Sequence, residues 1–381
     1  MAKVIWYVMV PGPRSTHFFN FRNLMKISFM VNQYARISGG NRALFEFANR
    51  LKTAGHEVRW FVLSKPIKWY RLDKKIIASM KRVITMSPET IDWIDNTIPI
   101  EILPINHPKY LPEADILVAT AWQTADFAAK LPKEKGMLFY FVLHYESLWT
   151  RYKKQALKTY DLACQKIVCS NWIKNKLIEK HGQDAEVLVI PVDQRVFYCD
   201  DKKWNSIRRV CMLHHDYDWK GYEDGIKAIK EVFAQGHKLE LVVFGEKLED
   251  PQPLFDAAGF DFEYHYRPAR ERLRKIYTSC DIFLCSSWYE GLGLTAMEAM
   301  ACRCSLVTAD TGGCLEYAID EQTALVSASR DISGLTRNLI RLLEDEELLK
   351  LLSEDGYRKI KEFNWEESCD RLMYLFEEGL A

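Results

Sequence analysis

Continuous apolar runs, separated by segments with helical periodicity, are the feature of this sequence that most constrains its fold. In the first half the runs are KISFMV (26–31), EVRWFVL (57–63), DILVAT (115–120), GMLFYFVL (136–143), QKIVCS (165–170) and EVLVIP (186–191). Strands buried on both faces have this composition, and they occur in parallel sheets that helices cover on both sides. The pattern therefore predicts an α/β fold with a doubly wound parallel sheet.

A second alternation of the same kind begins after the polar segment 194–207. Its apolar strands are RRVCML (208–213), KLELVVFG (238–245) and DIFLCSS (281–287), and helices are expected at 222–235 and 269–278. A chain of 381 residues is long enough for two domains with separate cores. We therefore predict one Rossmann-like domain over 26–195 and a second over 206–362, with ligands bound where the strands of both end at a common cleft.

The two ends of the chain fall outside this alternation. Residues 363–380 carry apolar positions at helical spacing and predict a terminal helix. Residues 1–25 form an unexplained N-terminal extension, because the run at 3–10 is cut off by Pro11-Gly12-Pro13. Residues 65–112 show no regular pattern, and no element is predicted there.

Composition excludes several classes of function. Lys plus Arg and Asp plus Glu both number 52, so no overall field favours nucleic acid. No run of about eighteen apolar residues predicts a membrane span. The ten Cys show no C-x-x-C spacing and no secretory signal is apparent, which favours reduced thiols in a cytoplasmic protein. Cys302, Cys304 and Cys314 are close enough in sequence to be considered as metal ligands, but buried free Cys is the commoner case.

The segment DIFLCSSWYEGLGLTAMEAM (281–300) combines a strand, a Gly-containing turn and a helix start. Glu290 lies at the turn, and Glu298 lies in the first turns of the helix. Gly291 and Gly293 allow the backbone to approach a bulky anion, and a helix start points N–H groups and a positive dipole end at it. The pattern predicts a nucleotide-sugar site, although two glutamates that simply face water would give the same spacing.

The sequence around these glutamates resembles a known family. EGLGLTAME is similar to the E-x7-E element of retaining glycosyltransferases, and TGGCLEYA (311–318) follows at the distance seen in those enzymes. Over roughly residues 26–381 the chain resembles glycosyltransferase family 4, of the two-domain GT-B fold. The resemblance implies an acceptor side in the first domain, a donor side in the second, and a terminal helix (363–381) that returns to the first domain.

The resemblance also assigns roles to residues of this element. Glu290 would contact hydroxyls of the donor sugar, and Glu298 would accept from the ribose hydroxyls. The turn and helix start would bind the donor through Gly291, Leu292, Gly293, Leu294 and Thr295, with the amides of the last two directed at the distal phosphate. Glu316 would be a further sugar or helix contact, unless it is a solvated side chain.

Two positions of the first domain match the family pattern. Gly39 and Gly40 follow the first strand and open a helix, where relatives carry a Gly-rich loop near the donor diphosphate and the acceptor. His144 ends the strand FYFVLH, where relatives carry a His beside the donor sugar. Glu146 is a weaker candidate that is equally explained as a surface residue.

Lys220-Gly221 matches the cation that relatives place on the diphosphate. The Arg that normally precedes it is replaced here by His214 or His215, and a His would serve only when protonated or as a neutral donor. Arg267 or Arg270 would be an alternative source of charge.

Asp216-Tyr217-Asp218 matches the D-x-D metal signature of the other large glycosyltransferase fold. It lies in a polar loop directly before Lys220, whose cation already meets the need for positive charge. We therefore expect no metal and no prosthetic group.

The resemblance implies a retaining transfer in which the leaving diphosphate oxygen takes the acceptor proton, with His144, Lys220 and Glu290 in the catalytic centre. The substrates would be a nucleotide-diphosphate sugar and a glycan, lipid-linked or small acceptor, in surface polysaccharide or glycoconjugate assembly, with peripheral membrane contact through segment 65–82. The alternatives are a sugar-nucleotide epimerase or phosphorylase of the same fold, and a catalytically degenerate protein that serves for nucleotide binding or as a scaffold. A glycosidase is disfavoured because both glutamates bracket a helix start, which is an anion site.

Overall fold

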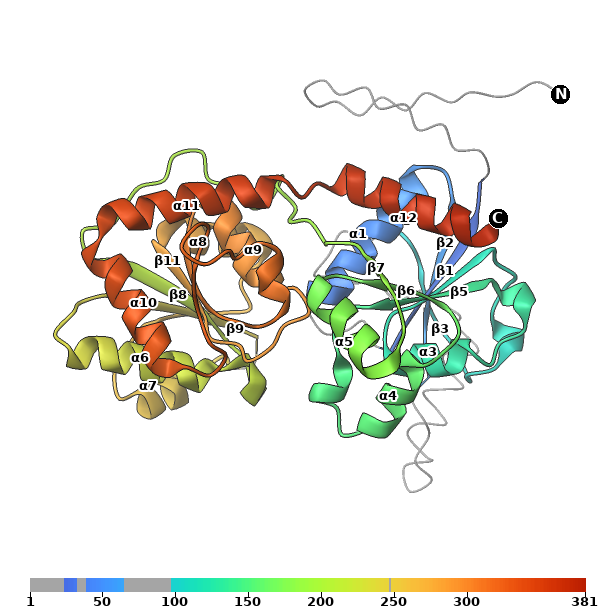
Figure 1. Ribbon diagram of the computed structural model, residues 1–381, viewed down its shortest axis with the longest axis horizontal. Helices are drawn as coiled ribbons and strands as arrows, with labels where there is room; N and C mark the ends of the chain where they lie inside the picture. Colours follow the sequence, from blue (N-terminus) through green and yellow to red (C-terminus); the bar gives the residue numbers. More distant parts are fainter. Residues whose placement is uncertain (1–23, 33–38, 65–96, 247) are drawn as a thin grey trace.

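The computed structural model describes residues 24–32, 39–64, 97–246 and 248–381, which form two α/β domains side by side (Figure 1). The predicted fold class of two Rossmann-like domains is confirmed. The extension up to residue 23 and segment 65–82 lie outside the described residues. All ten Cys are free thiols, and nine of them are buried.

The N-terminal domain is built on a seven-stranded sheet in which each neighbouring pair is parallel. Its order is β3 (Ile100–Ile102), β2 (Glu57–Val62), β1 (Lys26–Val31), β4 (Ile116–Ala119), β5 (Met137–Val142), β6 (Gln165–Val168) and β7 (Glu186–Val187). Its helices include α1 (Gly39–Thr53), α3 (Trp122–Ala128), α4 (Lys153–Tyr160) and α5 (Asn171–His181). Within this sheet, strand β3 was not predicted from the sequence.

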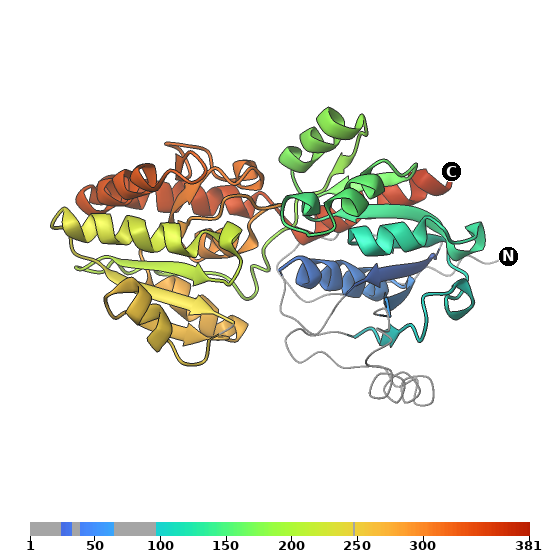
Figure 2. The same cartoon turned by 90° about the horizontal axis from the view of Figure 1, so that it is seen from below.

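The C-terminal domain repeats this plan with a six-stranded parallel sheet (Figure 2). Its order is β10 (Glu263–Tyr266), β9 (Glu240–Gly245), β8 (Arg209–His214), β11 (Ile282–Cys285), β12 (Ser305–Ala309) and β13 (Leu325–Ser327). The helices are α6 (Tyr222–Ala234), α7 (Gln252–Ala258), α8 (Arg270–Ser279), α9 (Leu294–Ala301), α10 (Ile332–Glu344) and α11 (Glu346–Lys361). In both sheets the strand order reverses beside the first strand, which is where such folds bind ligands.

The last helix, α12 (Trp365–Leu380), leaves the C-terminal domain and lies on the N-terminal one (Figure 1). Phe376 meets Phe139 of β5 edge-on, with ring centroids 4.8 Å apart, and Trp365 meets Phe47 of α1 at 4.9 Å. These aromatic contacts hold the end of the chain on the first domain's core.

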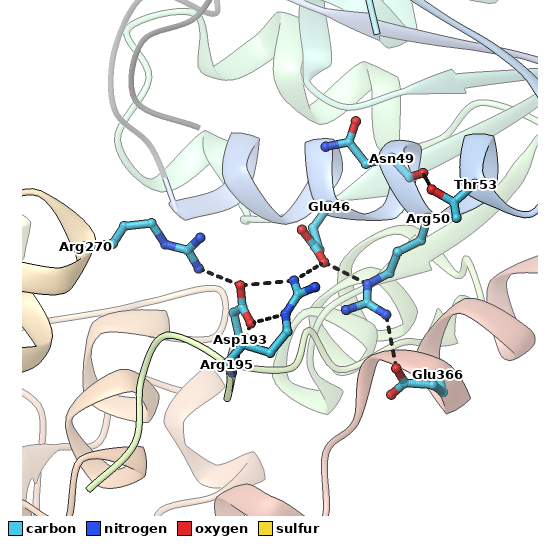
Figure 3. A network of polar contacts seen from close by, with 8 residues as sticks. All are labelled: Glu46, Asn49, Arg50, Thr53, Asp193, Arg195, Arg270 and Glu366. Carbon is cyan, nitrogen blue, oxygen red and sulfur yellow. Dashed lines mark hydrogen bonds and ion pairs between the residues drawn. The ribbon is translucent and has the colours of Figure 1, made fainter. Parts of the chain in front are cut away.

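A polar network joins the domains near the segment that links them (Figure 3). Asp193 of this segment accepts from Arg270 of α8 at 3.0 Å and from Arg195 at 2.9 Å. Arg195 also donates to Glu46 of α1 at 3.1 Å, and Glu46 accepts from Arg50 at 2.8 Å. Burial alone would raise the pKa of Asp193, but the two guanidinium groups hold it below its ordinary value. The network therefore keeps Asp193 ionised at the domain junction.

Candidate active site

The start of helix α9 lies at the domain interface. Its N-cap, Gly293, has φ 91°, and a β carbon there would lie 2.6 Å from the Tyr317 hydroxyl, which donates to the Gly293 carbonyl at 3.0 Å. A helix start leaves its first amides without intrahelical acceptors and carries a positive dipole end. The backbone of Leu294 and Thr295 can therefore offer donors to an anion.

Two of the predicted glycines lie where a β carbon would collide with neighbouring protein atoms. A β carbon on Gly291 would lie 1.9 Å from the carbonyl oxygen of Leu143, at the end of β5 in the other domain. The corresponding atom on Gly293 would meet the Tyr317 ring, as described above. Close packing therefore accounts for a residue without a β carbon at both positions, and their role toward an anion stays a prediction.

Glu290 and Lys220 form a nearly buried ion pair beside α9. Lys220 Nζ lies 2.7 Å from Glu290 Oε1, which also accepts from the Ser287 hydroxyl at 2.9 Å. Burial would raise the pKa of Glu290, but the Lys220 ammonium and these hydrogen bonds outweigh it and hold the pKa below its ordinary value. Glu290 is therefore an ionised acceptor rather than a proton donor.

His144 follows β5 and lies within electrostatic range of that pair. Burial lowers its pKa to about 4, with Lys220 acting in the same direction and Glu290 opposing it. Its Nδ1 accepts from the indole N–H of Trp149 at 3.3 Å, so the proton of the neutral ring lies on Nε2. Nε2 is buried and has no hydrogen-bond partner among the described residues. The ring thus offers a neutral N–H donor at the interface.

Aromatic rings from both domains surround this imidazole. Trp149 and Trp172 come from the N-terminal domain, and Trp219 and Tyr289 from the C-terminal domain, with ring centroids 5.5–6.4 Å from that of His144. Trp219 also stacks on Tyr289 at 5.5 Å. Such apolar walls exclude water and strengthen the electrostatic interactions they enclose.

Gly39 and Gly40 are the first residues of α1. A β carbon on Gly39 would lie 3.2 Å from Leu294 Cδ1, so the Gly-Gly turn of the N-terminal domain faces the start of α9. Leu292, another predicted donor contact, is 4% exposed and packs in the core. Only its backbone is therefore available to a ligand.

Glu298 lies on α9 and is 6% exposed. Its Oε1 accepts from Arg42 Nη1 of α1 at 3.0 Å, and the Tyr277 hydroxyl lies 3.5 Å from Oε2. Burial raises the pKa of Glu298, and Arg42 and Arg270 oppose that shift. The carboxylate is thus paired with a cation of the other domain.

Glu316 is a helix contact in this structure. It lies on a 3₁₀ turn (Gly313–Glu316), and its carboxylate accepts from the backbone and side-chain nitrogens of Asn171, the latter at 3.1 Å. Asn171 begins α5 of the N-terminal domain. Glu316 therefore joins the domains.

The structure argues against His214 as the replacement for the expected Arg. It is 6% exposed at the end of β8, burial lowers its pKa, and its Nδ1 has no hydrogen-bond partner among the described residues. A neutral buried ring supplies no phosphate charge. His215 Nδ1 accepts from the Tyr217 amide at 3.1 Å. Arg270 is held by Asp193, and Arg267 is exposed with φ 43° at the end of β10.

Asp216 and Asp218 are exposed in the loop between β8 and α6. Among the described ranges, no group of three or more His, Cys, Asp or Glu side chains is arranged to hold a metal.

Glu146 is buried, contrary to its interpretation as a surface side chain. It is 7% exposed, and its carboxylate lies 3.3 Å from the amide of Trp122 at the start of α3. Burial raises its pKa to about 8, with the Trp122 amide opposing the shift. Tyr160 contributes to this environment, since its hydroxyl accepts from the Glu146 amide at 2.8 Å.

The sequence analysis did not identify Arg42, Ser287, Trp149, Trp219 and Tyr289 as parts of the site. Arg42 stands two residues after Gly40, so a cation next to a Gly-rich turn was the available signal. No sequence signal marked the aromatic residues, because they come into contact only when the two domains pack together.

Comparisons with known proteins agree with this architecture. The family model for glycosyl transferases group 1 matches residues 203–359, most of the C-terminal domain. An uncharacterized glycosyltransferase of Methanocaldococcus jannaschii is 27% identical over 228 residues, which are 55% of this chain and 57% of that protein. A Campylobacter jejuni N,N'-diacetylbacillosaminyl-diphospho-undecaprenol alpha-1,3-N-acetylgalactosaminyltransferase is 26% identical over 159 residues, 40% of this chain and 41% of the other. The matches span about half the length of these relatives.

Similarity to solved structures extends over both domains. The Anabaena protein HepE, solved in complex with UDP and glucose, superposes with a TM-score of 0.71 at 15% identity. The superposition covers 93% of this chain and all of the other. The chain therefore has the GT-B fold, and the sequence similarities are to GT-B glycosyltransferases as a class.

Proposed function

We propose that this chain is a retaining glycosyltransferase, as in family 4, that transfers a sugar from a nucleotide-diphosphate donor without a metal ion. The observation that carries the proposal is the meeting of His144 from one domain with the Lys220–Glu290 pair and the α9 start of the other. An anion site, an ionised hydroxyl acceptor and a neutral N–H donor together suit a diphosphate with a sugar attached.

In the proposed reaction the bond between the anomeric carbon and the diphosphate oxygen breaks, and the acceptor oxygen bonds to the same face. The acceptor proton passes to the leaving phosphate oxygen. Lys220 and the α9 amides stabilise the negative charge that grows on the diphosphate. Glu290 and His144 orient the sugar hydroxyls, and neither acts as a Brønsted base.

The substrate classes are proposed from the relatives. HepE was solved with UDP and glucose, and the Campylobacter jejuni relative is named for a diphospho-undecaprenol acceptor. We propose a nucleotide-sugar donor and a glycan or lipid-linked acceptor, in surface polysaccharide or glycoconjugate assembly on the cytoplasmic side of a membrane. None of the helices in the described ranges has both the length and the apolar character needed to cross a bilayer.

The test is thermal stabilisation of the purified protein by UDP, GDP, ADP and dTDP, with Glu298→Ala alongside. A ligand that binds only the native state raises the melting temperature by mass action. We expect one nucleotide to raise it and the variant to lose most of that shift. No shift with any of the four would favour the scaffold alternative.

A further inference from the structure

A chain of polar contacts leads from the residue next to His144 to the protein surface. The Tyr145 hydroxyl lies 2.9 Å from His181 Nε2, and His181 Nδ1 lies 2.7 Å from Asp161 Oδ1. Tyr145 and the His181 side chain are each 6% exposed, whereas the Asp161 side chain is 58% exposed. Because a carboxylate only accepts, the His181 ring donates to Asp161 from Nδ1, and Nε2 of the neutral ring accepts from the Tyr145 hydroxyl.

The Tyr145 ring is fixed by stacking as well as by this hydrogen bond. It stacks on Tyr160 of α4 with ring centroids 4.9 Å apart, and His181, the last residue of α5, meets the same Tyr160 ring edge-on at 5.2 Å. The Tyr160 hydroxyl also accepts from the Glu146 amide at 2.8 Å. Helices α4 and α5 therefore hold the two residues that follow His144.

These contacts hold a sharp bend of the backbone. Tyr145 has φ −79° and ψ 78°, between the extended and helical regions and close to the values of an inverse γ-turn. The bend lies between β5 and the 3₁₀ turn Glu146–Leu148, so it decides where the chain carries the His144 side chain. Apolar side chains would fill the same space without the cost of desolvating a hydroxyl and an imidazole. Packing alone therefore does not explain these hydrogen bonds, whereas the direction they give to the bend does.

The imidazole of His144 contacts the other domain, whereas the side chain beside it is anchored in its own. His144 meets Trp219 and Tyr289 of the C-terminal domain, with ring centroids 5.5 and 5.9 Å apart. Tyr145 is bonded to α5 of the N-terminal domain. The anchor can therefore set the position of His144 through the backbone, without belonging to the aromatic cluster that surrounds the imidazole.

We propose that Tyr145, His181 and Asp161 are positioning residues for His144. Asp161 orients the His181 ring, His181 holds the Tyr145 hydroxyl, and the anchored Tyr145 fixes the bend that places the imidazole. This inference rests on the proposed function, in which the His144 N–H donates to a hydroxyl of the donor sugar. A group with that task must be held to within about 0.5 Å, and a supporting shell of locked side chains provides this.

The experiment compares Tyr145→Phe, His181→Leu and the double variant by steady-state kinetics and by NMR of the labelled His144 ring. We expect each single variant to lower kcat about tenfold with the donor KM nearly unchanged, and to shift the His144 ring signals. Because both substitutions remove the same hydrogen bond, the double variant should lose no more than the larger single loss. His181→Gln keeps an acceptor near the place of Nε2 and should recover most of the activity.

The matched control is His237→Leu, which removes an imidazole that lies 3.8 Å from the Glu344 carboxylate in the other domain. It should change neither kcat nor the His144 signals. Unshifted His144 signals in Tyr145→Phe, or losses that multiply in the double variant, would overturn the proposal. Tyr145→Phe removes a single oxygen atom, so it tests the bond even if His181→Leu does not fold.

The ring signals are recorded without donor or acceptor. A failure of this inference is therefore distinct from a failure of the proposed transferase activity, which the nucleotide shift reports.

Discussion

Arg42 of α1 and Glu298 of α9 form an ion pair of 3.0 Å that joins the two domains. If Glu298 receives the ribose hydroxyls, these hydroxyls compete with Arg42 for its Oε1. We therefore predict that Arg42→Ala lowers the unfolding free energy by about 3 kcal/mol, because it leaves a buried carboxylate unpaired, yet enlarges the stabilisation by nucleotide. Differential scanning fluorimetry with the nucleotide that binds measures both effects.

The control for Arg42→Ala is Arg50→Ala on the same helix. The Arg50 guanidinium pairs with Glu46 and Glu366 instead of with Glu298. It should lower stability without changing the nucleotide response. A smaller nucleotide shift in Arg42→Ala than in the wild type would mean that Arg42 itself contacts the nucleotide.

Gly291 controls how closely the domains approach. A β carbon there would lie 1.9 Å from the Leu143 carbonyl, so Gly291→Ala must separate the end of β5 from the E-x7-E turn. A displacement of about 1 Å in a catalytic centre costs about 100-fold in rate, and we expect a loss of that order in kcat. Nucleotide affinity should change less than about threefold, because Glu298 and the α9 amides, which would hold the ribose and the phosphate, belong to one domain.

Gly259→Ala is the control for Gly291, since nothing lies within 4 Å of a β carbon at that position, although its φ of 76° adds backbone strain. Steady-state kinetics and nucleotide titration separate the two effects. Equal losses of kcat and of nucleotide affinity in Gly291→Ala would show that the substitution damages the donor site itself.

The fold was predictable where buried strands form long apolar runs, although β10, β12 and β13 were not named from the sequence. KISFMV coincides with β1 at both ends, and DIFLCSS contains β11. Strand β3 was missed because three residues, Ile100–Ile102, are too short to show a period in an irregular stretch.

The candidate site was predictable where it is local in sequence. The Glu290 turn and the start of α9 form one strand-turn-helix and could be recognised from spacing. The Arg42–Glu298 pair joins residues 256 positions apart, and no local pattern specifies it. Glu146 was misjudged for the same reason, since the groups that bury it come from α3 and α4.

The proposed assignment of charge predicts that transfer does not depend on a metal ion. If Lys220 and the α9 amides supply the positive charge, transfer should persist in excess EDTA within about twofold of its untreated rate. Asp216→Ala/Asp218→Ala should behave likewise. If transfer strictly required Mn²⁺, and both EDTA and the double substitution abolished it, the D-x-D interpretation would be restored.

Trp149 should act as a positioning residue for His144. Trp149→Phe keeps an aromatic ring, although a smaller one, but removes the N–H that bonds Nδ1, so part of the imidazole population should move its proton to that atom. We expect a loss of about fivefold in kcat/KM, the value of one hydrogen bond of about 1 kcal/mol. The ¹⁵N chemical shifts of labelled His144 would report the tautomer directly.

Trp172→Phe is the matched control for Trp149, because its ring also meets the His144 edge, with centroids 6.4 Å apart. It should leave the tautomer unchanged. The same loss of activity in both variants, with unaltered nitrogen shifts, would mean that the rings act only through packing.

The buried Glu146 should make stability depend on pH. Its pKa is raised from 4.5 to about 8, so the native state binds this proton more tightly than the unfolded state between those values. Stability contributed by the protonated carboxyl is present below pH 4.5 and is lost as pH rises through 8. Glu146→Gln cannot ionise and keeps an acceptor for the Trp122 amide. It should therefore match the wild type near pH 5 and exceed it at pH 9.

Denaturant unfolding across pH 5–9 measures the difference in unfolding free energy between the wild type and Glu146→Gln. The contributions of the other titrating groups are the same in both proteins and cancel in this difference. Each unit of pKa shift corresponds to about 1.4 kcal/mol, so the gap at pH 9 should be several times larger than the error of extrapolation. The exposed Glu179→Gln on α5 makes the same chemical change and should run parallel to the wild type. If the Glu146→Gln and wild-type curves also ran parallel, Glu146 would have to be ionised in the native state throughout, with a compensating cation near its carboxylate.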